Sequence, residues 1–255
     1  VRLIGLPRDL ARTRSIFHVW YVAFNEYLAK RIPDRFLVIN EVTRAYVARL
    51  GVSADKISIS PADSIGIDGA LVDNTPRGKA RKELGISDKT PLVLSVGRLE
   101  PEKAFDELIT LFLDSGADAK LVILGEGVLR PRLEELIRTK GGEGKVTLAG
   151  LKNRRDIWKY YKDADAFALV SKTEGIGLVF WEAIIAGVPV IGRPVGGVKE
   201  TIGEDGLRGF LWDSADGADA FRERLERCFR KDADVRAMME RAGAFVRERL
   251  AEVKK

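Results

Sequence analysis

From about residue 91 onward, apolar runs of strand length alternate with segments in which apolar residues recur at helical spacing. This alternation is typical of repeated βα units, which build a parallel sheet with helices on its faces. The predicted strands are 92–96 (LVLSV), 120–124 (KLVIL), 146–149 (VTLA), 166–170 (AFALV) and 189–192 (PVIG). The predicted helices are 105–113, 129–138, 154–162, 177–186, 218–230 and 234–252. We therefore predict an α/β fold over residues 75–255, with a doubly wound, Rossmann-like parallel sheet.

The region ahead of this pattern is organised differently. Residues 35–40 and 56–60 have the composition of strands, and residues 41–51 between them have that of a helix, so they predict a single βαβ unit. The stretch 61–80 is rich in Gly, Asp and Pro and is interpreted as a linker, with a domain boundary near Asn74. Residues 1–74 are thus predicted to be the remnant of a second Rossmann-like domain. Because about 70 residues are few for such a domain and the chain begins with Val, we expect an upstream portion to be missing.

Composition narrows the class of protein. The 255 residues are 45% hydrophobic and 32% charged, which is ordinary for a globular protein. No apolar run approaches the roughly 20 residues that span a bilayer, and no signal segment opens the chain. The single cysteine, Cys228, excludes an internal disulfide and fits a reducing compartment. We expect a soluble cytoplasmic protein.

The net charge of +5 is unevenly distributed, because residues 1–60 hold 10 Lys and Arg against 5 Asp and Glu. In residues 2–14 four arginines precede an aromatic run that ends at Tyr27. Such a segment can dock on the anionic cytoplasmic face of a membrane, or it can be a solvated flank beside a buried helix, and both interpretations stay open. No nucleic-acid partner is expected, since the basic residues do not follow a recognisable reading module.

The residues that follow the predicted strands carry the candidate chemistry. Ligands of open α/β sheets bind beyond the carboxyl ends of the strands. After 92–96 come Gly97, Arg98 and Lys103, two cations suited to phosphate oxygens or simply two surface charges. After 120–124 comes a Gly-Glu-Gly turn that begins at Gly125 and allows close approach of backbone, although one such turn is a weak signal. After 189–192 a further glycine pair, 196–197, points to the same edge.

Two carboxylates mark the end of the strand 166–170. Glu174 and Glu182 stand eight residues apart. Glycines follow Glu174, and Glu182 lies within a predicted helix. One carboxylate can meet a polyhydroxyl ligand, while the peptide N–H groups of residues 176–179 open the helix and face an anion such as a diphosphate. The alternative is a surface glutamate in a loop and another on a solvated helix face. Convergence of four strand ends on one edge favours a ligand site.

Other chemistries find little support in the sequence. The Asp163-Ala164-Asp165 spacing is one that binds divalent metals elsewhere, but it precedes a strand and so lies at the wrong end of the sheet, which favours a structural role. His18, the only histidine, falls at helical spacing among aromatic residues. The sequence offers no Ser/His/Asp or Cys/His set and no cluster of metal ligands. A nicotinamide oxidoreductase is disfavoured because no G-x-G-x-x-G follows a strand.

Five ordered motifs give the sequence a resemblance to a known family. These are SISPADSIGIDGAL, VGRLEPEK, LVILGEG, VTLAGL and the long stretch from DADAFALVSKTEG to GVPVIGRPVGGVKETI. Between about residues 35 and 252 the chain resembles the retaining glycosyltransferases of family 4, which have the two-domain GT-B fold. The resemblance implies an acceptor-side domain at the N-terminus and a nucleotide-sugar-binding domain at the C-terminus.

The resemblance also implies roles for individual residues. Arg98 and Lys103 would act in catalysis by neutralising the donor diphosphate, with Glu174 beside the donor sugar. Glu182 would bind the ribose hydroxyls. The segment Gly150–Leu151 would flank the nucleobase. The implied donor-binding set is completed by Gly97, Gly125, Ser171, Gly175, Ile176, Gly177, Leu178 and Val179. The donor would be a UDP-, GDP- or ADP-sugar, with no cofactor and no metal, because two cations and a helix N-terminus replace the divalent ion.

The sequence departs from the family pattern in three places. Ala104 stands where the family usually has Gly, and Val170 precedes Ser171 where it usually has Pro. More seriously, most of the acceptor-binding domain is absent, with its glycine-rich loop and its sugar-contacting histidine, a role that His18 does not match. The predicted function is the donor-binding half of an enzyme that transfers a sugar with retention to an unknown glycan, lipid or small molecule. The alternative is an inactive nucleotide-sugar-binding or interaction module.

Overall fold

The computed structural model of the chain describes residues 2–4, 36–38, 41–49, 51–59, 72 and 74–252. It forms two compact units, one of Val1–Gly66 with Val253–Lys255 and the other of Ile67–Glu252. The basic-aromatic segment and His18 fall largely or wholly outside the described residues. The assignment of the two units to an acceptor side and a donor side stays a prediction.

The first unit contains a small parallel sheet. Its strands β1 (Arg2–Ile4), β2 (Phe36–Val38) and β3 (Ile57–Ile59) lie in that order, and α2 (Glu41–Arg49) connects β2 to β3. The 3-10 turn η2 (Ala54–Lys56) leads into β3. The predicted βαβ unit is therefore confirmed, while β1 has no counterpart among the predicted strands. Four buried apolar side chains hold the layers together: Phe36, Val38, Val47 and Ile57.

The second unit is built on a six-stranded parallel sheet. Its strands are β4 (Leu92–Val96), β5 (Lys120–Leu124), β6 (Val146–Leu148), β7 (Ala166–Leu169), β8 (Val190–Gly192) and β9 (Phe210–Leu211). The five predicted strands are confirmed to within one residue at each end. All residues of β4 and β7 are buried, which explains their mainly apolar runs, because helices cover a parallel sheet on both faces.

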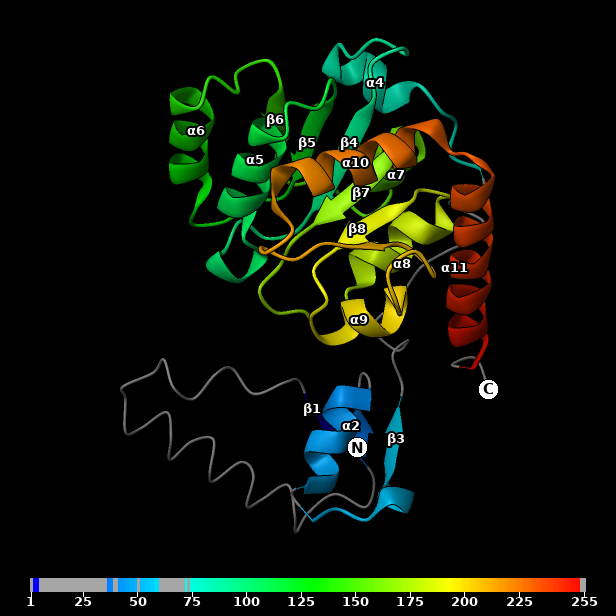
Figure 1. The fold of residues 1–255 in the computed structure, drawn as a ribbon. Coiled ribbons are helices and arrows are strands. Elements are labelled where there is room, and N and C mark those ends of the chain that lie inside the picture. Colours follow the sequence, from blue (N-terminus) through cyan, green and yellow to red (C-terminus); the bar gives the residue numbers. More distant parts are fainter. Residues whose placement is uncertain are drawn as a thin grey trace. The chain divides into compact units, whose positions relative to one another are not determined.

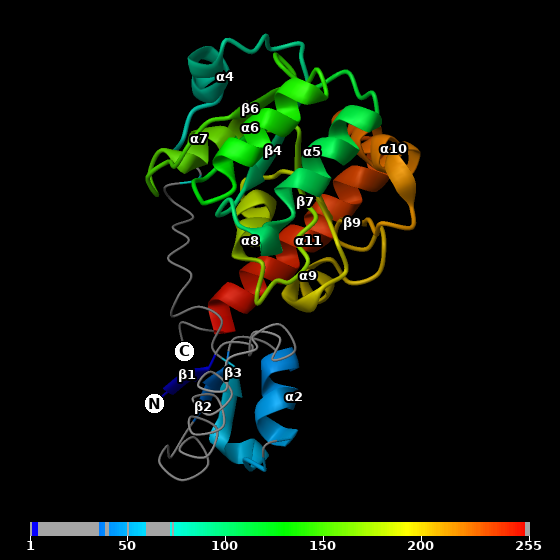
Figure 2. The same cartoon turned by 90° about the vertical axis from the view of Figure 1, so that its left-hand side faces the viewer.

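Helices lie on both faces of this sheet (Figures 1 and 2). They are α4 (Lys79–Leu84), α5 (Phe105–Asp114), α6 (Arg130–Thr139), α7 (Ile157–Asp163), α8 (Leu178–Ile185), α9 (Gly196–Ile202), α10 (Gly217–Arg230) and α11 (Ala233–Glu252), with the 3-10 turn η3 (Pro101–Lys103) ahead of α5. On one side α5 contacts α6 and α10, and on the other α11 contacts α8 and α9. Within the described part of the chain no helix combines the length and the apolarity needed to cross a membrane.

The strand order reverses at the centre of the sheet, and we call the region beyond the carboxyl ends of β4 and β7 the crevice. The order is β6-β5-β4-β7-β8-β9, so the chain builds outward from β4 to β6 and then returns to the other side of β4 to build β7 to β9. Doubly wound sheets bind ligands where this reversal occurs, beyond the carboxyl ends of the two central strands. Here those strands are β4 and β7, which pair through Val93 with Ala166 and Leu94 with Phe167.

The opposite, amino-terminal end of the sheet holds the two aspartates that the sequence analysis assigned to structure. Asp163, at the end of α7, accepts hydrogen bonds from the backbone N–H groups of Gly78, Ala80 (2.8 Å) and Arg81 (3.1 Å). These are the first N–H groups of α4, which has no cap from a neighbouring side chain. Asp163 therefore caps a helix from about 80 residues away, and the structural assignment is confirmed. Because α4 begins at Lys79, the predicted linker 61–80 ends two residues too late.

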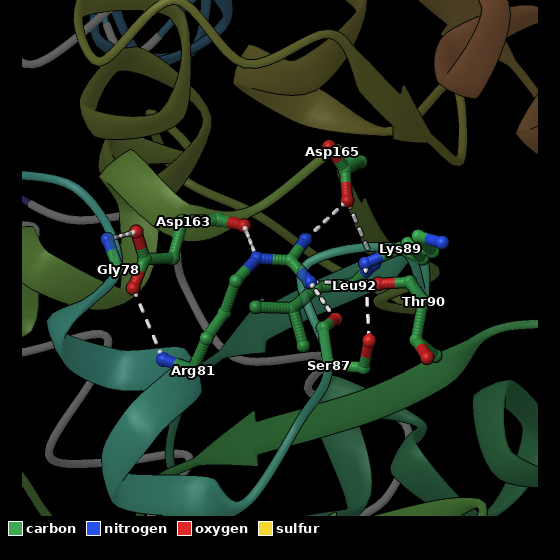
Figure 3. Close-up of polar contacts among 8 residues, drawn as sticks. All are labelled: Gly78, Arg81, Ser87, Lys89, Thr90, Leu92, Asp163 and Asp165. Atoms are coloured by element: carbon green, nitrogen blue, oxygen red, sulfur yellow. Dashed lines mark hydrogen bonds and ion pairs between the residues drawn. The ribbon is translucent and has the colours of Figure 1, made fainter.

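Arg81 completes this cluster (Figure 3). Its guanidinium donates to the Asp165 carboxylate at 2.5 Å and to the carbonyl oxygens of Ser87 at 2.9 Å and Thr90 at 2.7 Å. A further bond of 3.2 Å reaches the carbonyl oxygen of Asp163. The buried arginine thus connects α4, the turn that leads into β4 and the start of β7. We call Arg81, Asp163 and Asp165 the amino-end clasp.

Candidate functional site

The loops that follow β4 and β7 meet at the crevice. The N–H of Lys172 donates to the carbonyl oxygen of Glu102 at 2.9 Å, which fixes one loop against the other. Lys103 then lies with its Nζ 2.5 Å from Oε1 of Glu174. Two candidate residues that are 71 positions apart in the sequence thus form an ion pair at the reversal point of the sheet.

Glu174 is held by two hydrogen-bond donors, but both bind the same carboxylate oxygen. Its side chain is 8% exposed and that of Lys103 is 18% exposed. The hydroxyl of Ser171, which follows β7 and is itself buried, donates to the same Oε1 atom at 3.0 Å. Both partners therefore bind one carboxylate oxygen, and among the described residues no hydrogen bond reaches Oε2. A carboxylate oxygen of this kind can accept a hydrogen bond from a ligand.

Arg98, the second predicted cation, does not join this pair. Its guanidinium is 60% exposed and forms ion pairs with Glu100 at 2.5 Å and with Glu102 at 3.7 Å. Because exposed ion pairs contribute little, the side chain can exchange these partners for a stronger anion at small cost. The structure therefore places Arg98 at the rim of the crevice and Lys103 inside it.

Close backbone packing explains the glycines after β4 and β5. Gly125 has φ +148°, and a Cβ atom there would lie 1.9 Å from the carbonyl oxygen of Gly97. The N–H of Gly125 donates to the carbonyl oxygen of Gly150 at 3.0 Å. The predicted residues Gly97, Gly125 and Gly150 are thus brought together from the ends of three adjacent strands, and only glycine fits at the middle one.

The glycine pair after β8 plays a similar part on the other side of the crevice. Gly196 has φ +47°, and a Cβ atom there would lie 1.9 Å from the carbonyl oxygen of Glu174. The N–H of Gly197 donates to the carbonyl oxygen of Gly175 at 3.0 Å. These two glycines fix the backbone that carries Glu174. The sequence pointed to this pair, but the predicted site set left it out.

The start of α8 has peptide N–H groups that receive no partner among the described residues. Gly177 has φ +72° and stands at the N-cap position, where glycine has no side chain of its own to cap the helix. The predicted helix start at 177 is thus one residue early. On this otherwise buried helix, the partly exposed positions Leu178, Val179, Glu182 and Ile185 form one strip. An uncapped helix start has N–H groups available for an anion, and its dipole favours negative charge there.

Glu182 lies on that strip and is half-buried. The hydroxyl of Tyr161, on α7, donates to its Oε2 at 2.7 Å. Burial raises the pKa of the Glu182 carboxyl, an effect that the Tyr161 hydrogen bond and the charge of Arg154 partly offset. Burial also raises the pKa of Tyr161 well above its usual range, so the phenol stays protonated and donates. Sequence analysis missed Tyr161, whose only signal is its place in an apolar helical stretch.

The rim of the crevice beyond β5 and β6 is apolar and exposed. The side chain of Leu151 is 76% exposed and that of Val128 is 80% exposed. An exposed leucine in this position suits a flat apolar ligand group, although the contact with a nucleobase stays a prediction. Within the described ranges, no group of three or more His, Cys, Asp or Glu residues is arranged to hold a metal ion.

Comparison with known proteins places the chain in a family. The model of the family described as glycosyl transferases group 1 matches residues 76–245, which contain the whole crevice. The chain belongs to this family. The matched segment lies within the second unit, and it begins just ahead of α4 and ends within α11.

Relatives of this group 1 chain include the D-inositol 3-phosphate glycosyltransferase of Nocardia farcinica, 34% identical over 206 residues, which are 73% of this chain and 45% of that protein. The sulfoquinovosyl transferase of Arabidopsis thaliana is 34% identical over 131 residues, 51% of this chain and 25% of that protein. The chain thus spans less than half the length of these relatives.

Solved structures show the same fold. The structure of Anabaena HepE in complex with UDP-glucose superposes with a TM-score of 0.78 at 20% identity, covering 98% of this chain and 69% of that one. Sucrose-phosphate synthase from Thermosynechococcus elongatus gives a TM-score of 0.76 at 24% identity, covering 97% and 60%. The fold is that of GT-B glycosyltransferases, as the sequence motifs predicted.

Proposed function

We propose that the second unit binds a nucleotide-sugar donor and forms the donor half of a retaining, family 4 glycosyltransferase. The observation that carries this proposal is the Lys103–Glu174 pair at the reversal point of the sheet, in which Glu174 is buried and Lys103 is partly buried. Among the described residues, no hydrogen bond reaches the second carboxylate oxygen of Glu174. A cation next to a carboxylate with spare acceptor capacity matches a ligand that is anionic at one end and rich in hydroxyls at the other. A nucleotide sugar has both properties.

The diphosphate of the donor is proposed to lie between Lys103 and the start of α8. Lys103 supplies one charge, the uncapped N–H groups of residues 177–179 supply hydrogen-bond donors, and Arg98 at the rim supplies a second charge. Negative charge grows on the diphosphate as the bond to the sugar breaks, so the same groups stabilise the departing nucleoside diphosphate. In this proposal the cations and the helix dipole take the place of a divalent metal.

The two glutamates then have separate tasks. Glu174 accepts a hydrogen bond from a hydroxyl of the donor sugar, using the oxygen that Lys103 and Ser171 leave free. Glu182, one helical turn along α8, accepts from the ribose hydroxyls, and Leu151 lies against the base. A UDP-sugar is one candidate donor, since the similar structure of HepE holds UDP-glucose, and GDP- and ADP-sugars are the others. The acceptor and a contact of the N-terminal segment with a membrane stay predictions.

Calorimetric titration of the chain with UDP, GDP and ADP tests donor binding. We expect one of the three to bind and to raise the melting temperature, and the Glu182→Ala variant to lose most of this affinity while keeping its fold. The matched control is Glu135→Ala, since Glu135 is an exposed glutamate on α6 that pairs only with Arg138 in the described structure. Absence of any shift in melting temperature at millimolar concentrations of all three nucleotides would contradict the proposal.

Transfer is tested separately from binding. Incubation with the UDP-, GDP- or ADP-sugar that binds, and with glycan, lipid and small-molecule acceptors, should release the nucleoside diphosphate and give a product with the anomeric configuration of the donor. NMR of the anomeric proton distinguishes retention from inversion. Binding without release in any acceptor mixture supports the alternative of a binding module.

A further inference from the structure

Tyr161 is a buried tyrosine whose ring is fixed by aromatic neighbours. On α7 it lies 5.6 Å from the ring of Trp158 and, across the layer, 6.0 Å from that of Phe167 on β7. Phe167 in turn packs edge-on against Phe180 on α8, at 5.1 Å. Packing on this scale restricts the side chain to one rotamer, so the position of its hydroxyl is set by the core of the second unit.

The hydroxyl of Tyr161 has one proton to donate and two acceptors within reach. It lies 2.7 Å from Oε2 of Glu182 and 3.4 Å from the carbonyl oxygen of Val179. The shorter distance lies within the range of a strong hydrogen bond, whereas the longer one is weak. The proton therefore goes to Glu182, the residue to which the proposed function assigns the ribose.

This hydrogen bond determines how the Glu182 carboxylate is presented. Tyr161 binds Oε2, and among the described residues no hydrogen bond reaches Oε1. A half-buried carboxylate without such an anchor would be free to rotate on its flexible side chain, and fixing it would cost free energy each time a ligand bound. With Oε2 anchored on a rigid ring, Oε1 is held in a fixed position and is left for a ligand.

We propose that Tyr161 is a positioning residue, which fixes the Glu182 carboxylate for the ribose hydroxyls of the donor and so creates a preference for ribonucleotides over deoxyribonucleotides. The proposal rests on the proposed function, because it needs a ribose at Glu182. A site built to bind a hydroxyl rejects an analogue that lacks it, since the buried acceptor is then left unpaired. The size of that preference is therefore the direct measure of how well Glu182 is held.

The neighbouring residue provides a matched control. Tyr160 is also fully buried on α7, and its hydroxyl also donates to a glutamate, but that glutamate is Glu83 on α4, at 2.5 Å. Tyr160→Phe therefore makes the same chemical change one position away, removes a hydrogen bond to a carboxylate, and leaves Glu182 untouched.

The test measures the affinity of the wild-type chain, Tyr161→Phe and Tyr160→Phe for the nucleoside diphosphate that binds and for its 2′-deoxy and 3′-deoxy counterparts. We expect Tyr161→Phe to reduce the ribose preference by about three- to tenfold, the effect of one hydrogen bond, and Tyr160→Phe to leave it unchanged. In a Glu182→Ala background, Tyr161→Phe should have no further effect on the preference, because the two side chains act as one unit. Melting temperatures confirm that each variant is folded.

The outcomes separate this inference from the proposed function. If the wild-type chain binds none of the nucleoside diphosphates, both are wrong. If it binds with a ribose preference that Glu182→Ala abolishes and Tyr161→Phe preserves, the proposed function stands and the positioning role is wrong. Equal loss of affinity for ribo- and deoxyribonucleotides in Tyr161→Phe also contradicts the inference, because it indicates only a damaged fold.

Discussion

Two groups of charged residues lie at opposite ends of the same parallel sheet, and they differ in how completely their hydrogen-bonding capacity is used. In the amino-end clasp, both carboxylate oxygens of Asp163 accept backbone N–H groups, and the Arg81 guanidinium donates from all three of its nitrogens. In the crevice, Glu174 and Glu182 each accept hydrogen bonds on one oxygen only, among the described residues. Asp163 and Arg81 are therefore satisfied by the protein, although Asp165, whose side chain is 32% exposed, also accepts on one oxygen only, Oδ2. In the crevice, both acids have an oxygen that receives no hydrogen bond from a described residue.

This difference in hydrogen bonding distinguishes residues with a structural role from residues of a candidate ligand site better than residue type does. Both groups contain a cation and two acids, and both lie between β4 and β7. A carboxylate oxygen that receives no hydrogen bond from a described residue is available to a ligand, so the crevice suits a ligand site, whereas the bonded Asp163 and Arg81 suit a structural role. Four changes test the contrast.

The largest expected effect is on stability and comes from the clasp. Asp163→Ala removes the acceptor of three N–H groups at the start of α4, which should lower the free energy of unfolding by about 2–4 kcal/mol. Urea denaturation measures this loss, with Asp219→Ala, an exposed aspartate on α10, as the control. At a temperature where the variant is folded, its affinity for nucleoside diphosphate should equal that of the wild type. A stable variant with weakened binding would reverse the assignment of the two ends.

The next effect concerns the crevice and is an increase in affinity. Glu174→Gln removes the negative charge that neutralises Lys103 and repels an incoming diphosphate, so we expect several-fold tighter binding of free nucleoside diphosphate at low salt. Transfer of sugar should fall at the same time, because the acceptor for the sugar hydroxyl is weakened. Calorimetry with the nucleoside diphosphate measures the first effect, and Glu135→Gln is the control. Weaker binding by Glu174→Gln would show that Lys103 does not meet the diphosphate.

A smaller effect on stability is expected from replacement of Glu182. Replacement should stabilise the protein, whereas replacement of a residue with a structural role would destabilise it. Because burial raises the pKa of Glu182 above its ordinary value of 4.5, its ionised form opposes folding at neutral pH. Glu182→Gln keeps the shape and accepts from Tyr161, so it should raise the melting temperature at pH 8 and lower nucleotide affinity. The gain in stability should vanish below about pH 4.5. Scanning calorimetry across this range checks the sign, and destabilisation at pH 8 would count against a ligand-binding role.

The smallest effect is expected at the surface between α4 and α7. Hydrogen bonds from Lys159, Tyr160 and Lys152 lower the pKa of Glu83 to about 2. The stabilisation this provides is present above pH 4.5 and is lost as the pH falls toward 2. Since the Glu83 side chain is 39% exposed, Glu83→Gln should cost less than about 1 kcal/mol at pH 7, and less still at pH 3. Urea denaturation at both values measures it, and nucleotide affinity should not change.

The strands could be predicted from the sequence because β4, β5 and β7 are almost wholly buried and read as mainly apolar runs. The short elements could not. β9 has two residues, β1 has three, and α4 depends on a cap from Asp163, which no local pattern reveals. Their stability comes from tertiary contacts, whereas sequence patterns report local preference.

The candidate site, too, could be predicted from the sequence only in part. The residue types at the strand ends were visible in the sequence, because a parallel sheet gathers its strand ends at one edge. The pairing of Lys103 with Glu174 crosses 71 residues, and that of Tyr161 with Glu182 crosses from α7 to α8. Neither follows from spacing, since each depends on how two loops or two helices pack. Sequence therefore indicated which edge of the sheet carries the candidate site, and the structure shows which of the candidate side chains are in contact.

The glycines that bring the strand ends together have a consequence for how the site can change. Any side chain at Gly125 or Gly196 would place its Cβ atom 1.9 Å from a carbonyl oxygen, so these positions are closed to mutation. Leu151 and Val128, exposed on the rim, are open to almost any replacement. In the proposed donor site, variation in nucleotide preference is therefore expected on the rim, while the frame stays constant. A mutant library aimed at a new nucleotide should randomise the rim and leave the glycines alone.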